Sequence, residues 1–228
     1  MDTTRPGKRE RTRRRLLDAG LLVVAERGDA LTATDVVVAA DVSNGTFYNH
    51  FDDRDDFMRA LAYESLAALT ERSADRTRGA DPAWRFAVAS MRVLDAGARD
   101  PVWARAVLRL HESPTPIHEA VQGHLRADLA AGHRVGRFSH GDDPVTVDLV
   151  SGTLMAALRR VAGPAFDADG APSVAVAGAA VAGAGPDFLV AVVTRLLQAL
   201  GVEESEAHAL AFAAYEDQGS SVSDSVPG

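Results

Sequence analysis

The segment Ser43–Phe51 constrains this chain most, because its residues fit a helix with two different faces. A rotation of about 100° per residue places its two phenylalanines on one side and Gly45, Thr46 and Asn49 on the opposite side. The aromatic side is suited to packing into a core, and the polar side is suited to contact with a nucleic acid. The segment is therefore predicted to be a DNA recognition helix.

Three further side chains, Asn44, Tyr48 and His50, lie on the flanks of this helix. A hydroxyl or an imidazole at these positions can reach phosphates that line a groove of DNA. Tyr48 is the strongest candidate for such a phosphate contact. The alternative is that Tyr48 packs into the core beside the phenylalanines.

Two helices are predicted before the recognition helix. Apolar residues group on one side of the segment 8–27, and Gly28 supplies a stop. Thr32 and Asp35 have the spacing of a capping box, which predicts a short helix over 33–40. Together with the recognition helix, these elements form the pattern of a helix-turn-helix.

The turn of such a motif requires a positive φ, and Asp41 stands at that position. Aspartate tolerates this conformation better than most residues but less well than glycine. Ser43 is predicted to cap the recognition helix, and Asp53 to cap a long fourth helix that runs toward Arg78. This fourth helix is expected to join two domains.

The rest of the chain consists of apolar-periodic segments separated by proline and glycine, and none has the pattern of a strand. An all-α fold is therefore predicted. The segments expected to be helical are 83–98, 102–112, 116–134, 144–162, 186–200 and 203–214.

Two of these segments carry a regular apolar stripe that could form a dimer interface. The alternative is that both stripes pack only inside their own subunit. The stripe residues are Val150, Leu154, Leu158, Val161, Leu189, Val193, Leu196 and Leu200.

The predicted domains are a DNA-binding domain over 1–52, whose residues 1–7 form a basic disordered arm, and a helical domain over 53–216. The Gly/Ala-rich segment 163–185 is expected to be a flexible connection. Residues 217–228 lack any apolar period and are expected to be disordered.

The charge distribution supports a DNA-binding role despite a net charge of −8. The first 15 residues hold seven basic and two acidic side chains, so positive charge is concentrated beside the predicted helix-turn-helix. The chain has no cysteine, which excludes disulfides and cysteine-containing zinc sites. No signal segment and no apolar run long enough for a membrane span is found, so a cytoplasmic protein is expected.

The segments 16–28, 31–36 and 42–51 resemble the TetR family of transcriptional regulators, and the similarity extends to about Phe57. The later segment 192–202 resembles the C-terminal helix of that family less specifically.

The resemblance implies roles for individual residues of the helix-turn-helix. Contacts to the DNA backbone are implied for Thr32, Tyr48, His50 and Arg54. Contacts to bases are implied for Thr34, Asn44, Thr46 and Asn49.

Three features depart from the family pattern. Asp41 replaces the usual turn glycine, Val37 replaces a small alanine, and the loop after Gly28 is one residue shorter. Asp41 also adds negative charge near DNA, so modest affinity or unusual specificity is expected.

The resemblance further implies a homodimer whose helical C-terminal domain binds a small-molecule effector and thereby changes the separation of two recognition helices. The expected function is a transcriptional regulator, most simply a repressor that an effector releases from its operator. The alternative is a degenerate member of the family that acts through ligand or protein binding with little sequence-specific DNA binding.

Candidate pocket residues were selected as aromatic, methionine and histidine side chains of the C-terminal domain. They are Trp84, Phe86, Met91, Trp103, His111, His124, Phe138 and Met155. The five histidines between 111 and 140 lack the spacing of metal ligands on one helix. No catalytic motif is present, so no metal, no cofactor and no enzymatic activity are expected.

Overall fold

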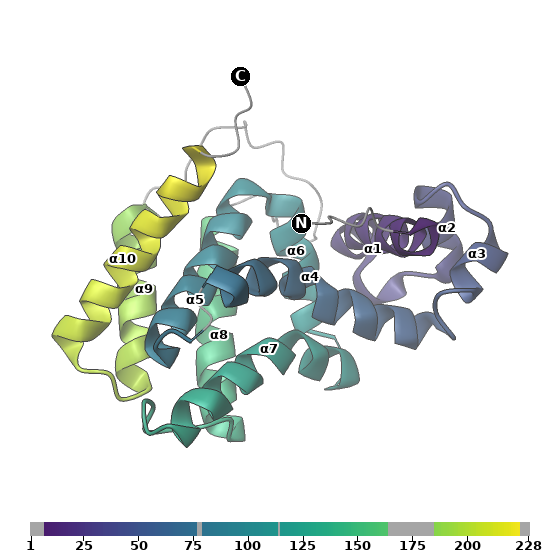
Figure 1. The fold of residues 1–228 in the computed structure, drawn as a ribbon. Helices are drawn as coiled ribbons and strands as arrows, with labels where there is room; N and C mark the ends of the chain where they lie inside the picture. Colours follow the sequence, from purple (N-terminus) through teal and green to yellow (C-terminus); the bar gives the residue numbers. More distant parts are fainter. Residues whose placement is uncertain (1–6, 77–78, 114, 164–184, 224–228) are drawn as a thin grey trace.

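The computed structural model describes residues 7–76, 79–113, 115–163 and 185–223. Within these residues the protein is entirely helical, as the sequence predicts, and contains ten α-helices and one short 3-10 helix (Figure 1). The elements are α1 (Lys8–Arg27), η1 (Gly28–Ala30), α2 (Ala33–Ala39), α3 (Asn44–Tyr48), α4 (Arg54–Arg76), α5 (Pro82–Arg99), α6 (Pro101–His111), α7 (Thr115–Arg134), α8 (Pro144–Val161), α9 (Pro186–Ala199) and α10 (Glu204–Ser223).

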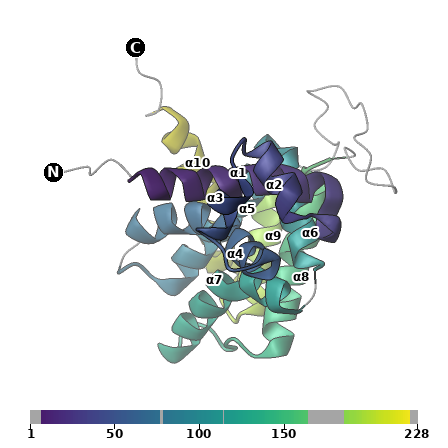
Figure 2. The same ribbon diagram turned by 90° about the vertical axis from the view of Figure 1, so that its right-hand side faces the viewer.

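The first three helices form a unit at one end of the molecule (Figures 1 and 2). The predicted cap residues are confirmed: Gly28 ends α1 with a φ of 55°, and Thr32 and Asp35 form a complete capping box at α2. The Ser43 hydroxyl accepts a hydrogen bond from the Thr46 amide at 3.2 Å and starts α3. Local side-chain chemistry therefore determines where each of these short helices begins.

An aromatic cluster holds α3 in place. Phe47, Phe51 and Phe57 are at most 2% exposed, and their ring centroids lie 4.9 to 5.5 Å apart. Phe57 belongs to α4, so the same cluster fixes the recognition helix against the long connecting helix. The prediction that Phe47 and Phe51 face a core is confirmed, although α3 is shorter than predicted and ends at Tyr48, before Phe51.

Helix α4 leads from this unit into the C-terminal bundle (Figure 1). Its start is capped as predicted, because Asp53 Oδ1 accepts a hydrogen bond from the Asp56 amide at 2.7 Å. Further along, the Trp103 indole N–H on α6 donates to the Ser65 carbonyl at 3.2 Å. Helix α4 is thus attached to both parts of the protein.

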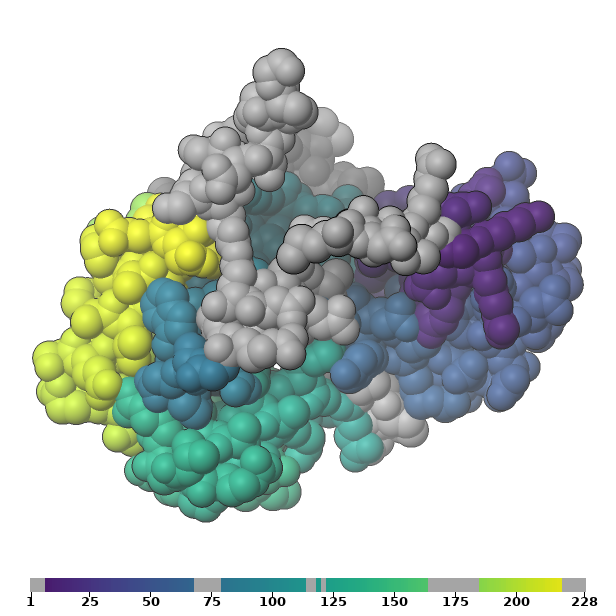
Figure 3. Space-filling model, viewed as in Figure 1, coloured from purple at the N-terminus to yellow at the C-terminus, as the bar shows by residue number. Residues whose placement is uncertain are grey.

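Helix α5 lies at the centre of the bundle and contacts α4, α6, α7, α8, α9 and α10. Helices α5, α6, α8 and α9 each begin with a proline, whose fixed φ suits the first helical position. The space-filling view shows α5 packed against α7 and α10, with α1 on the side of the molecule opposite α10 (Figure 3).

The last helix is longer than the sequence pattern predicts. Residues 217–228 were expected to be disordered, but α10 continues to Ser223. Asp217 lies 3.7 Å from Arg92 on α5, and the Gln218 amide donates to the Ala214 carbonyl at 3.4 Å. This ion pair and this hydrogen bond support the helical conformation of residues 217 and 218. Residues 164–184, most of the expected flexible connection, lie outside the described residues.

The predicted dimer stripes are corrected by the structure, because their side chains fill the subunit's own core. Seven of the eight are at most 8% exposed, and Val161 is half-buried. The apolar period of a helix indicates that one face is buried, but it does not indicate whether the same subunit or a partner subunit buries it. The buried residues are Val150, Leu154, Leu158, Leu189, Val193, Leu196 and Leu200. Among the described helices, none has both the length and the apolar character needed to cross a membrane.

Candidate DNA-binding surface and effector cavity

The polar side of α3 is exposed, as the helical rotation predicts. The helix itself lies at the end of the molecule that faces the viewer in Figure 2. Tyr48 is 58% exposed, which excludes the alternative that it is a core residue. Asn44 and Asn49 are exposed and Thr46 is half-buried, while Thr34 is exposed at the start of α2. The four residues expected to read bases thus lie on two neighbouring helices of one unit.

Gly45 lies on this exposed side and has open space around it. A Cβ atom built there would meet only the Ser43 hydroxyl, at 3.8 Å. Its φ is not in the left-handed region, so the backbone does not require glycine either. Nothing within the described residues explains the glycine, although alanine would favour the helix. Close approach of an external partner to the backbone does explain it.

The hydroxyl groups of Thr32 and Thr46 are engaged in capping. Thr32 Oγ1 donates to Asp35 Oδ2 at 2.7 Å and accepts from the Asp35 amide at 3.2 Å. The hydrogen bonds from Thr32, first from its side chain, hold the pKa of Asp35 below its usual range. Thr46 Oγ1 lies 2.9 Å from Ser43 Oγ. Contacts of these threonines with DNA would therefore share groups that already stabilise the helix starts.

Arg54 acts first as a clamp within the protein. Its Nε donates to the Leu31 carbonyl at 2.8 Å, one terminal nitrogen donates to the Asp29 carbonyl, and the other lies 3.0 Å from Asp55. Each terminal nitrogen of Arg54 retains a second N–H group. The predicted phosphate contact would have to use these two remaining N–H groups. The sequence did not reveal this role, because its partners are backbone carbonyls of the loop before α2.

Several cations of α1 lie beside the end of α3. Arg9 donates to the Asn49 carbonyl at 3.5 Å, and the guanidinium of Arg13 lies 5.0 Å from the centre of the Phe51 ring. Burial, followed by the charges of Arg9 and Arg13, lowers the pKa of His50. His50 is therefore neutral at pH 7 and can donate one N–H to a phosphate.

The structure accommodates the three departures from the family pattern, at Asp41, at Val37 and in the short loop after α1. Asp41 adopts the predicted positive φ, 49°, and among the described residues other than glycine it is the one that does so. Its carboxylate lies 3.3 Å from Arg15, which reduces its negative field at the surface. Val37 is 5% exposed and joins the core, and the short loop after α1 forms the 3-10 helix η1.

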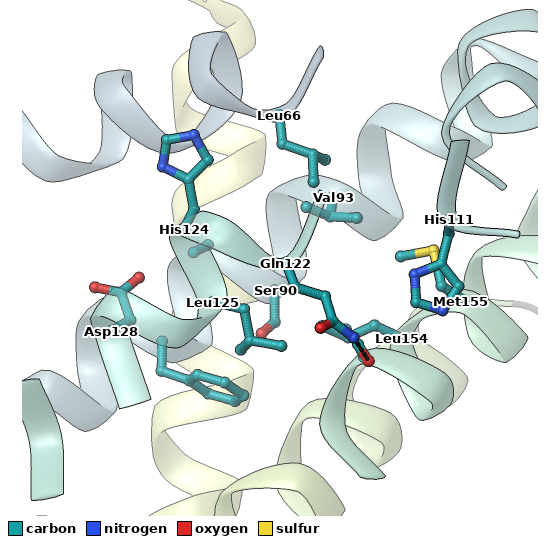
Figure 4. Close-up of a pocket in the computed structure, with 13 residues that line it drawn as sticks. Leu66, Ser90, Val93, His111, Gln122, His124, Leu125, Asp128, Leu154 and Met155 are labelled. Atoms are coloured by element: carbon teal, nitrogen blue, oxygen red, sulfur yellow. Dashed lines mark hydrogen bonds between the residues drawn. The ribbon is translucent and has the colours of Figure 1, made fainter. Parts of the chain in front are cut away.

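A cavity of about 70 Å³ lies between α4, α5, α6, α7 and α8 (Figure 4). Four of the predicted pocket residues line it: Phe86, His111, His124 and Met155. Its remaining lining residues, which the selection by residue type missed, are Leu66, Ala89, Ser90, Val93, Gln122, Leu125, Asp128, Ser151 and Leu154.

The other four predicted pocket residues do not line this cavity and are corrected. Met91 is completely buried in the core, and Trp84 packs partly buried against it. Phe138 packs on Phe86 with ring centroids 6.0 Å apart, and Trp103 donates its indole N–H to α4. Residue type alone does not give the direction in which a side chain points.

One wall of the cavity is polar. The Gln122 amide donates to the Ser151 hydroxyl at 2.9 Å, and both side chains are at most 5% exposed. Arg126 donates to the amide oxygen of Gln122 at 3.2 Å, which fixes the orientation of that amide. The Nδ1 atom of His111 is buried and forms no hydrogen bond with any described residue. Burial, followed by the charge of His118, lowers the pKa of His111, so its ring is neutral at pH 7.

Hydrogen bonds connect the end of α6, whose last residue lines the cavity, to the helix-turn-helix. His111 is the last residue of α6, and Ser113 just beyond it lies 2.6 Å from the carboxylate of Asp29 in η1. The Asp29 carbonyl in turn accepts from Arg54 at the start of α4. Within the described part of the chain, no group of three or more histidine or acidic side chains could hold a metal ion.

Residues 16–61 match the family described as bacterial regulatory proteins, tetR family. The chain is 42% identical over 95 residues to the HTH-type transcriptional repressor LfrR of Mycolicibacterium smegmatis, covering 40% of this chain and 48% of that protein. It is 34% identical over 111 residues to an uncharacterised HTH-type transcriptional regulator of Mycobacterium bovis, covering 45% and 54% respectively. The matches thus span about half the length of these curated relatives.

Similar solved structures extend over nearly the whole chain. The structure of RolR in complex with the ligand resorcinol is 25% identical, with a TM-score of 0.54, and the match covers 90% of this chain and 94% of RolR. A gamma-butyrolactone receptor described as ArpA-like is 19% identical, with a TM-score of 0.53 and coverage of 92% and 100%. This second likeness concerns the fold alone.

Proposed function

We propose that this chain, which belongs to the TetR family of transcriptional regulators, is a repressor that a small-molecule effector releases from its DNA operator. The observation that carries the proposal is the exposed polar side of α3, where Gly45 leaves the backbone open and Arg9 lies adjacent. The likeness to the repressor LfrR supports repression rather than activation.

We propose that Tyr48 and His50 contact phosphates, and that Asn44, Thr46, Asn49 and Thr34 read bases. Phosphate contacts position a protein on any duplex, whereas contacts to base edges distinguish sequences. We further propose that Arg54 contacts a phosphate through the second N–H groups of its terminal nitrogens, and that main-chain N–H groups at the start of α2 are additional donors.

The first prediction separates these roles. Tyr48→Ala should weaken binding to operator and random duplex alike, by about tenfold, because the lost contact carries no sequence information. Asn49→Ala should weaken operator binding by about the same factor but leave binding to random duplex unchanged. Titrating both variants against both duplexes by fluorescence anisotropy measures the difference.

The same titration in a salt series tests the function as a whole. Operator affinity of the unmodified protein should fall by about a thousandfold between about 50 and 200 mM salt if several phosphates are contacted. Equal affinity for the upstream DNA of its own gene and for random duplex, followed by no enrichment in a genomic selection, would instead favour the degenerate-member alternative.

The proposed active form is a homodimer, because helix-turn-helix dimers place two recognition helices about 34–36 Å apart on successive major grooves. We propose that the outer face of α8 forms the seam. Val145 and Leu149 are 75% and 50% exposed there, and Gly152 and Ala156 continue the same stripe with small residues. The stripe ends at Arg160, whose guanidinium lies 5.2 Å from the centre of the Phe188 ring on α9.

The second prediction concerns this seam. Leu149→Arg should give monomers in sedimentation and lower operator affinity by more than about a hundredfold, because a charge buried in an apolar interface has no partner. Val135→Arg is the matched control, since Val135 is 67% exposed but lies outside the stripe. A Leu149→Arg protein that still sediments as a dimer would exclude the outer face of α8.

Release by an effector is proposed to follow the path from His111 and Ser113 through Asp29 to Arg54. A ligand shifts the protein only by the difference between its affinities for the two arrangements of the recognition helices. The similar regulator RolR has been solved with resorcinol, which supports a small organic molecule as the effector here.

A further inference from the structure

The size of the cavity limits what it can hold. A volume of about 70 Å³ is smaller than the roughly 150 Å³ of an engineered apolar cavity that binds benzene. A single ring is therefore the largest compound that a small outward movement of the walls would admit. A fused polycyclic compound or a long acyl chain does not fit.

The lining has an apolar middle part with polar side chains on both sides of it. Leu66, Val93 and Leu125 surround the apolar part, the side chain of Gln122 points toward the end at which His111 lies, and His124 and Asp128 lie on the opposite side (Figure 4). Asp128 is paired with Arg85 and His124 stacks on Tyr63, so a ligand with one polar group is oriented toward the His111 end.

The hydrogen bonds at the polar end have a defined direction. Arg126 donates to the oxygen of Gln122, so the amide nitrogen of Gln122 faces Ser151 and donates to its hydroxyl. The Ser151 proton then has no recorded acceptor among the described residues. The Nδ1 atom of His111 likewise has no recorded partner, and buried polar atoms of this kind usually face a ligand or water. At this end the cavity thus offers the Ser151 hydroxyl as a donor and the Nδ1 atom of His111, while a second hydroxyl, that of Ser90, also belongs to the lining.

Among the described residues that line the cavity, none carries an unpaired charge. The carboxylate of Asp128 is paired with Arg85, and the lowered pKa of His111 favours its neutral ring; Arg126, which donates to Gln122 and to the Asp142 carbonyl, is not a lining residue. A charged ligand would lose its hydration without meeting an unpaired opposite charge in the lining, which is costly in a buried site.

From this geometry we infer that the effector is an uncharged, single-ring molecule bearing a hydroxyl group, which accepts a hydrogen bond from Ser151 and donates one to His111. This inference rests on the proposed function, because it takes the bound molecule to be the effector that releases the protein from DNA. The binding itself is a property of the free protein and is tested without DNA.

The test uses four ring compounds of similar size: phenol, toluene, benzoate and benzylamine. By thermal shift and calorimetry on the full chain, phenol at about 10 mM should raise Tm by about 3–6 °C, with a Kd on the order of 1 mM. Toluene should bind roughly tenfold more weakly because it lacks the hydroxyl, and the two charged compounds should bind more weakly still.

Two variants assign the binding to this cavity. Ser151→Ala should reduce phenol affinity by about three- to tenfold while leaving toluene affinity unchanged, a difference that a merely structural change would not produce. Ala89→Leu, which adds volume at the lining, should weaken both compounds together. A Ser151→Ala effect equal on phenol and toluene would overturn the hydroxyl contact.

The inference is overturned if phenol gives no shift at about 10 mM, if toluene binds as tightly as phenol, or if benzoate or benzylamine binds as tightly. If phenol binds as expected but does not release operator DNA, the cavity chemistry stands and the proposed effector mechanism fails. If operator binding is absent altogether, the repressor proposal fails and the cavity result is unaffected.

Discussion

Replacing Gly45 with leucine is expected to lower operator affinity by about a hundredfold or more while leaving the thermal stability of the protein unchanged. In the free protein a Cβ atom at Gly45 meets only the Ser43 hydroxyl, at an ordinary contact distance of 3.8 Å, and the helix gains slightly from losing a glycine. On DNA the same side chain would occupy the space between α3 and the groove. A loss of about 1.5 kcal/mol per subunit, doubled in a dimer, gives this factor.

The measurement is an operator titration together with a thermal melt of each variant. Gly45→Ala, Gly45→Ser and Gly45→Leu should weaken binding in the order of their side-chain volume. Ala98→Leu on α5 is the matched control, because it also adds a large side chain at an exposed helical position. Gly45→Leu protein with full operator affinity would show that α3 does not approach DNA through this side.

The helix-turn-helix could be predicted closely because its signals are local. The capping-box pair Thr32 and Asp35 indicates the start of α2 from residues within one helical turn. The positive φ of Asp41 follows from its position in the turn between two short helices. Periodicity also placed Phe47 inside and Asn49 outside. Each of these features depends on residues within about four positions along the chain.

The C-terminal site could be predicted less well because it depends on contacts between distant helices. The direction of the Gln122 amide is fixed by Arg126 and by Ser151 on α8, and no pattern within α7 reveals this. The apolar stripe through Leu154 and Leu196 was recognised, but its partner could not be read from periodicity. The Arg54 clamp was also hidden, since its acceptors are main-chain carbonyls.

Gly20→Val is expected to lower the free energy of unfolding by about 3 kcal/mol, equivalent to about 6–12 °C in Tm. Gly20 lies in the middle of α1, where a Cβ atom would come within 2.4 Å of the Phe57 ring and 3.3 Å of Leu61. Phe57 is completely buried, so it has no free space into which to move. Helices α1 and α4 must therefore separate, and the surrounding packing is lost.

The matched control is Gly45→Val, which makes the same substitution in a helix with open space and should leave Tm nearly unchanged. A second variant tests the cause. Phe57→Leu removes the ring atoms that clash, so the double variant should be more stable than the sum of the two single effects predicts. Simple additivity would show that the Gly20–Phe57 contact is not the source of the loss.

The consequence of Gly20→Val should extend to DNA binding. The Phe57 ring lies 5.3 Å from Phe47 and 4.9 Å from Phe51, so displacing it disturbs the cluster that supports α3. Operator affinity should therefore fall together with stability in Gly20→Val, and both should recover in part with Phe57→Leu. Gly45→Leu should lose affinity alone. The comparison distinguishes Gly20, which the packing of α1 on α4 requires, from Gly45, which is required only when DNA is bound.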